Sequence, residues 1–241
     1  MAKVNKLQFT LLSLGVCSIG LVSILSYNAV DNSLSQIDKQ YIAKYLVEVR
    51  SLPEKPTYED EVNFIMSVQH SVLSVAPRNE GIPFGQKREP KELYEAKTGL
   101  CFDRSRVIEK ILRYSGFDAR HVFMLSKEKT GSALRAIMTV GVPTHAVTEV
   151  LTKNGWLVVD SNAYWVSTDA EGRPASMEKI QYDVEHSVPI RWGEEPPLIV
   201  YEKYAKPFTF VYGLYSRHGY FYPPYNVVPD VNYGELLQNL L

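Results

Sequence analysis

Cysteine is almost absent from this chain of 241 residues, which has only Cys17 and Cys101. Cys17 lies inside an apolar run and Cys101 in the polar remainder, so a bridge between them is implausible and a disulfide framework is excluded. Cys101 is therefore a lone thiol. Because a lone thiol in an oxidising compartment is vulnerable unless it is buried or used, Cys101 is the first candidate for a functional side chain.

An excess of charge of one sign is also lacking. Lys and Arg number 26 against 27 Asp and Glu, for a formal net charge of −1. This balance gives no electrostatic footprint for nucleic acid, so no nucleic-acid partner is expected. Internal repeats and low-complexity tracts are missing too. The remaining composition, 45% hydrophobic and 22% charged, is that of a globular chain with room for an anchor segment and one enzyme-sized domain.

The one long apolar run covers residues 7–27 and contains no charged residue. At about 1.5 Å rise per residue, a helix of this length can cross a hydrocarbon layer of roughly 30 Å. Lys3 and Lys6 precede the run and Asp31 follows it, which by the positive-inside rule places the N-terminus in the cytoplasm. Residues 1–30 are therefore predicted to be an N-terminal transmembrane anchor.

This interpretation makes the chain a single-pass protein of a bacterial inner membrane, with its C-terminal domain in the periplasm. Two alternatives stay open. One is a cleaved signal peptide, although no small-residue cleavage site follows the run. The other is a lipoprotein modified at Cys17, where the bulky Val16 is unfavourable.

The rest of the chain divides into three predicted parts. Residues 31–56 form a helical linker that ends in a segment broken by Pro53 and Pro56. Residues 57–170 form the core, and residues 171–241 form an aromatic-rich C-terminal extension that packs on it. Prolines mark the boundary between linker and core because they interrupt helices.

The core begins with helices and continues with strands. Thr57 and Asp60 form a capping box at the start of the first helix, and a second helix covers residues 101–114 and ends at a serine–glycine pair. The apolar period then changes from 3.6 to 2, which predicts strands at 121–125, 136–142, 145–151 and 156–160. Asn154-Gly155 joins the last two as a hairpin. The predicted fold class is α+β, helices followed by an antiparallel sheet, with an N-terminal transmembrane helix.

The predicted elements bring together residues suited to nucleophilic catalysis. Cys101 begins a helix, where the dipole and free N–H groups lower the pKa of a thiol. Alternation places His145 and Asp160 on facing strands of the hairpin, with Val150 opposite Leu157, so that imidazole and carboxylate are within reach. A thiol, a histidine base and a carboxylate that orients the histidine are the parts of a cysteine-based catalytic triad.

Four ordered sequence blocks carry a family resemblance. The segment Lys97-Thr98-Gly99-Leu100-Cys101-Phe102-Asp103, preceded by Arg88-Glu89-Pro90, is similar to the approach to the nucleophile in transglutaminase-like domains. The stretch from Leu112 to Arg120 resembles that family's "LLR-x-x-G-x-x-A-R" block. Thr144-His145-Ala146-Val147-Thr148-Glu149-Val150 and Gly155-Trp156-Leu157-Val158-Val159-Asp160 resemble its "H-A-x-x-E-V" and "G-W-x-x-x-D" blocks. The resemblance covers roughly residues 57–165.

The resemblance implies thiol-dependent acyl transfer at an amide bond, by a peptidase, an amidase or a transglutaminase-type enzyme, and the predicted anchor places this activity in the cell envelope. Cys101 would attack the carbonyl and provide an oxyanion donor through its N–H, His145 would move the proton, and Asp160 would orient His145. Substrates would be peptides, proteins or amino-bearing envelope polymers, with the membrane as a partner through the anchor. No cofactor or metal is expected. Two alternatives stay open: an amide-linked glycan hydrolase similar to the peptide N-glycanases, and a catalytically silent, membrane-tethered interaction module.

The C-terminal extension is crowded with aromatic residues. They pack the core and the edges of extra strands in one interpretation, and form a wall of the substrate groove in the other. They are Tyr204, Phe208, Phe210, Tyr212, Tyr215, Tyr220, Phe221, Tyr222 and Tyr225.

Overall fold

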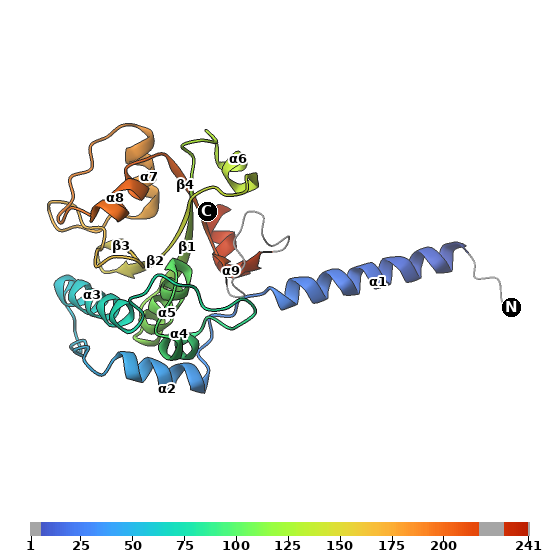
Figure 1. Ribbon diagram of the computed structural model, residues 1–241, viewed down its shortest axis with the longest axis horizontal. Helices are drawn as coiled ribbons and strands as arrows, with labels where there is room; N and C mark the ends of the chain where they lie inside the picture. The colour runs from blue at the N-terminus through green and yellow to red at the C-terminus, as the bar shows by residue number, and fades with distance from the viewer. Residues whose placement is uncertain (1–5, 217–228, 241) are drawn as a thin grey trace.

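The computed structural model describes residues 6–216 and 229–240, with side chains described from residue 14 onward. Helix α1, Lys6–Tyr27, extends away from the rest of the chain (Figure 1). Its end is fastened to the domain, because Val30 N donates to Val231 O at 2.8 Å and Val231 N donates to Asn28 O at 2.9 Å. The apolar run of the sequence thus forms a helix, as predicted.

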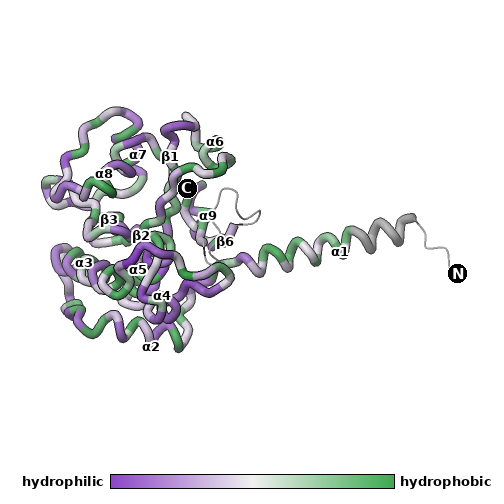
Figure 2. Tube along the Cα trace, in the orientation of Figure 1, coloured by the Kyte–Doolittle hydropathy of each residue, from purple (hydrophilic) through white to green (hydrophobic). Residues whose placement is uncertain are grey.

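The membrane prediction is overturned. Within the described residues no helix is both long enough and apolar enough to cross a bilayer. Weakly polar positions interrupt the apolar residues in the described part of α1 (Figure 2). This finding corrects the predicted transmembrane anchor and, with it, the predicted single-pass topology, inner-membrane location and periplasmic domain.

A four-stranded antiparallel sheet lies at the centre of the domain, in the order β3-β2-β1-β4. Its strands are β1 (Ala119–Ser126), β2 (Thr144–Thr152), β3 (Gly155–Val159) and β4 (Phe208–Tyr212). The predicted hairpin is confirmed, including the pairing of Val150 with Leu157. Gly155 has a φ of +125°, a conformation that explains the glycine at this turn. The fold is therefore α+β, as expected.

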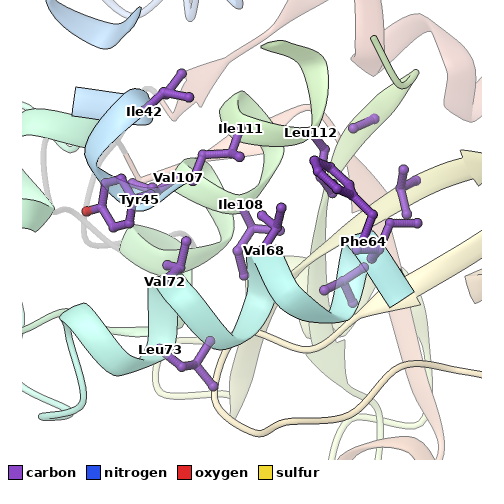
Figure 3. Packing of buried hydrophobic residues seen from close by; sticks show 14 of the residues in the cluster. Ile42, Tyr45, Phe64, Val68, Val72, Leu73, Val107, Ile108, Ile111 and Leu112 are labelled. Carbon is purple, nitrogen blue, oxygen red and sulfur yellow. The ribbon is translucent and has the colours of Figure 1, made fainter. Parts of the chain in front are cut away.

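One face of the sheet is covered by helices from the first half of the chain. They are α2 (Gln36–Tyr45), α3 (Tyr58–Val75), α4 (Pro90–Ala96) and α5 (Cys101–Tyr114). Val68 and Val72 of α3 pack with Ile108 of α5 in a cluster that includes Val150 and Leu157 of the sheet (Figure 3). The predicted capping box at Thr57 is present, and the predicted helix at 101–114 has the observed bounds of α5.

The opposite face is covered by the C-terminal part of the chain. Helices α7 (Met177–Glu185) and α8 (Leu198–Tyr204) pack over it (Figure 1). Their buried residues, among them Ile180 and Val200, form a second cluster with Val147 and Val158 of the sheet. The extension also supplies β4, which pairs with β1 along Val122–Ser126. The helices and the strand together enclose the sheet between two helical layers.

The strand predicted at 136–142 is wrong. Residues Ala133–Met138 form helix α6, which begins after Ser132, whose hydroxyl accepts a hydrogen bond from Arg135 N. β1 is already paired on both sides, by β2 and β4, so its edges offer no place for another strand. The alternation of apolar residues here reflects one buried contact, at Ala136, rather than a sheet face.

The last described segments pack beside α5 and β1. They are β5 (Leu214–Tyr215), which pairs with β6 (Asp230–Val231), followed by α9 (Tyr233–Leu237) and η1 (Gln238–Leu240). Of the predicted aromatic cluster, Tyr204, Phe208, Tyr212 and Tyr215 are buried in the domain. Tyr220, Phe221, Tyr222 and Tyr225 lie outside the described residues.

Truncating the helical core should destabilise the domain. Ile108→Ala removes a side chain that is fully buried between α3, α5 and the sheet. Its free energy of unfolding is expected to fall by about 2–5 kcal/mol, measured by urea denaturation. Ile37→Ala on α2 is the control, since Ile37 is 52% exposed and should cost less than about 0.5 kcal/mol. Equal losses from both variants would contradict the assignment of the core.

Candidate functional site

Cys101 is the first residue of α5, and three neighbours fix it there. Leu100 N donates to Asp103 Oδ2 at 2.8 Å, which closes the first helical turn. Asp103 in turn pairs with Arg88 at 2.5 Å, and both side chains are buried. At Gly99 a Cβ would lie 2.5 Å from Leu93 Cδ1 and 3.2 Å from Asp103 Cβ, so a larger residue here would displace the buried Leu93 side chain. Cys101 as a whole residue is partly exposed.

Arg104, one turn after Cys101, links α5 to two loops. Its Nε donates to Ala76 O at 2.8 Å and its Nη2 to Arg78 O at 2.7 Å. Its Nη1 reaches Asn162 Oδ1 at 2.8 Å, in the turn that follows β3. The start of α5 is therefore tied to the segment that contains Asp160.

His145 and Asp160 are hydrogen-bonded, as the register predicted. His145 Nε2 lies 2.7 Å from Asp160 Oδ2, and the two side chains are 2% and 0% exposed. β2 and β3 pair as far as Thr148 and Val159. Continued alternation beyond that point places the His145 and Asp160 side chains on the same face of the sheet as diagonal neighbours.

Asp160 accepts hydrogen bonds through both carboxylate oxygens. Oδ1 accepts from the backbone N–H groups of Asn162 and Ala163 at 2.7 and 3.0 Å. Oδ2 accepts from His145 and from the hydroxyl of Tyr204 at 3.2 Å. Burial opposes ionisation, but the charge of His145 and these donors hold the pKa of Asp160 below its ordinary value. The site therefore contains a buried carboxylate in its ionised form.

Cys101 and His145 interact as a second pair. Nε2 of His145 is committed to Asp160, while the buried Nδ1 makes no hydrogen bond with any described residue, which leaves this nitrogen free to act on the thiol. Burial raises the pKa of Cys101, but the neighbouring His145 and the N–H of Ala146 lower it below the ordinary thiol value. Burial lowers the pKa of His145, but the charge of Asp160 outweighs it and raises that pKa to about 9. The arrangement favours a thiolate beside an imidazolium.

Two residues of the site were missed by sequence reasoning. Gln69 of α3 donates its side-chain Nε2 to the carbonyls of Asp160, Ala163 and Trp165, at 2.7, 3.0 and 2.7 Å. It holds the turn after β3 in place. A polar residue on the otherwise apolar face of α3 was a usable signal. Tyr204 was treated only as one aromatic among many, and its hydrogen bond to Asp160 had no signal in the sequence.

A pocket opens beside His145. It has a volume of about 320 Å³ and lies between the ends of β1 and β2 and helix α8. Its walls are mostly apolar, with charged side chains at positions 128, 202, 203 and 206. Cys101 does not line it, so the pocket adjoins the site on the histidine side.

Comparison with known families decides what this region is. Residues 49–161 match the family model described as the transglutaminase-like superfamily. This stretch of the chain is therefore similar to transglutaminase-like domains. The match contains Cys101, His145 and Asp160, and a domain of this superfamily is compatible with thiol-dependent acyl transfer. No match was found among curated proteins or among solved structures.

The transglutaminase-like domain brings the three predicted catalytic side chains together, while their catalytic assignment stays a prediction. Other polar candidates have structural roles. Arg120 pairs with the buried Glu149 at 2.7 Å. His121 is buried against Ser105, at 3.1 Å, and stacks on Tyr215. Among the described residues no three His, Cys, Asp or Glu side chains are grouped in a way that could hold a metal ion.

Removing the amide of Gln69 should destabilise the transglutaminase-like domain. Gln69→Met keeps the length of the side chain. It leaves the Asp160 carbonyl without a donor among the described residues and removes one of two donors from the carbonyls of Ala163 and Trp165. Since an unsatisfied buried group costs about 1–3 kcal/mol, the free energy of unfolding should fall by about that amount. Gln86→Met, at an exposed position, is the matched control and should change it by less than about 0.5 kcal/mol. If the two variants unfold alike, Gln69 does not hold the turn.

Proposed function

We propose that the domain is a cysteine-nucleophile enzyme that cleaves or exchanges amide bonds, with Cys101, His145 and Asp160 as its catalytic residues. The observation that supports this most strongly is the contact of 2.7 Å between His145 Nε2 and the buried Asp160 carboxylate. This contact fixes the ring, raises its pKa and leaves Nδ1 for the thiol. A histidine held in this way can both stabilise a thiolate and deliver a proton.

The reaction follows from these positions. The Cys101 sulfur attacks the carbonyl carbon of the amide, and the oxygen takes the negative charge of the tetrahedral intermediate. When the C–N bond breaks, His145 gives its proton to the leaving amine and a thioester remains on Cys101. Water or a second amine then attacks the thioester, gives its proton to His145 and releases the acyl group, which restores the thiolate. The backbone N–H of Cys101, at the start of α5, is one donor to the oxyanion.

Alkylation of Cys101 by iodoacetamide should reveal the thiolate. The pKa of Cys101 is lowered and that of His145 is raised to about 9. The thiolate and the imidazolium should therefore coexist from a pH below the ordinary thiol pKa of about 8.5 up to about pH 9. His145→Ala removes the imidazole that lowers the thiol pKa, so the midpoint of the alkylation rate should move to higher pH. His70→Ala changes an exposed histidine and should leave the profile unaltered. An unchanged midpoint in His145→Ala would contradict the proposed pair.

Acylation by an activated ester tests catalysis itself. The wild-type chain should take one acetyl group from p-nitrophenyl acetate on Cys101, with release of p-nitrophenol, and Cys101→Ala should not. Asp160→Asn should slow this step by on the order of 10²–10⁴-fold, because the imidazole loses the partner that orients it and stabilises its charge. Asp118→Asn, an exposed carboxylate, is the control. Absence of acetylation in the folded wild-type chain would point instead to a silent interaction module.

A further inference from the structure

The pocket beside His145 is placed to bind a particular part of the substrate. His145 protonates the leaving amine, so the group attached to that amine must lie on the histidine side of the thiol. The pocket borders Thr144 and His145 and does not border Cys101. In transfer the incoming amine gives its proton to the same ring and therefore occupies the same position. The pocket therefore lies where the amine component of the substrate would bind.

Lys203 is the charged group of this pocket that is available to a ligand. Lys206 already pairs with Glu128 at 3.4 Å, and both side chains are about half exposed. Glu202 is exposed to solvent, while Lys203 is half-buried. Within the described part of the chain Lys203 makes no ion pair. Its positive charge acts on both Cys101 and Asp160, which places it close to the reacting groups.

Helix α8 is held against the site by the residue after Lys203. Tyr204 is buried and donates its hydroxyl to Asp160 Oδ2 at 3.2 Å. Lys203 is therefore fixed at the pocket rather than carried by a free surface helix. Ile199 lies one turn before it and adds an apolar wall, together with Met124 and Phe208. A positive charge beside an apolar wall is suited to bind a carboxylate that is attached to a hydrocarbon group.

We propose that this pocket binds the amine component of the substrate and that Lys203 recognises a carboxylate on it. The preferred substrates are then amides whose amine component is an apolar amino acid, as a leaving group in hydrolysis or as an acceptor in transfer. This inference rests on the proposed function. It adds a specificity-determining residue that lies outside the family match at 49–161.

The inference is tested by measuring how the acetyl group on Cys101 is divided between two competing amines. The full chain is acetylated with p-nitrophenyl acetate and then challenged with equal concentrations of leucine and leucinamide. The amine nitrogen attacks the thioester carbon, the C–S bond breaks, and the amine proton passes to His145. The measured quantity is the ratio of N-acetylleucine to N-acetylleucinamide, determined by mass spectrometry. The two amines differ in intrinsic reactivity, so the comparison is made between variants.

The ratio should fall about tenfold in Lys203→Gln, the lower end of what a charged hydrogen bond contributes, and further in Lys203→Glu. Lys206→Gln is the matched control, because it removes the same charge from the same pocket. Lys206 is already paired with Glu128, so this variant should keep the wild-type ratio.

Normal acetylation with the same ratio in wild type and Lys203→Gln would overturn the inference and leave the proposed function intact. So would an acetyl-enzyme that decays only to acetate, at one rate with and without leucine. Failure of acetylation would reject both.

Discussion

The buried carboxylate of Asp160 is the group on which the rest of the site depends. A carboxylate removed from water is stable as an ion only when donors surround it. Asp160 has four, from His145, Tyr204 and two backbone N–H groups. Its position determines the orientation of the imidazole, and through the imidazole the charge of the thiol. Gln69, which holds the backbone of this turn, belongs to the same arrangement.

The C-terminal part of the chain completes this site, although it lies beyond the transglutaminase-like match at residues 49–161. It supplies β4 to the sheet and, through α8, the Tyr204 hydroxyl that reaches Asp160. A strand paired within the sheet and a side chain hydrogen-bonded inside the site are parts of one core. The pocket beside His145 lies where the matched and unmatched regions meet, so its lining comes from both segments.

Helix α5 shows how burial and charge are combined. Its apolar residues, such as Ile108 and Leu112, face the core, as their spacing predicts. Its polar residues are buried too: Lys110 pairs with Asp38 at 2.9 Å and Arg106 with Glu89 at 3.3 Å. Side chains of this kind would be placed on a solvated face by periodicity alone. Because they are paired, α5 is enclosed on all sides, and its first residue, Cys101, keeps a fixed position.

The sequence alone determined the α+β class, the bounds of α5, the hairpin and the pairing of His145 with Asp160. These features depend on local effects: helix capping, the Asn154-Gly155 turn and the alternation of apolar residues along the strands. The sequence-based predictions of a membrane-crossing helix and of a strand at 136–142 were wrong. Only the tertiary structure decided that Gln69 and Tyr204 converge on Asp160 and that Lys203 lies at a pocket beside His145. Those contacts join residues far apart in the chain, and packing, which no local pattern encodes, brings them together.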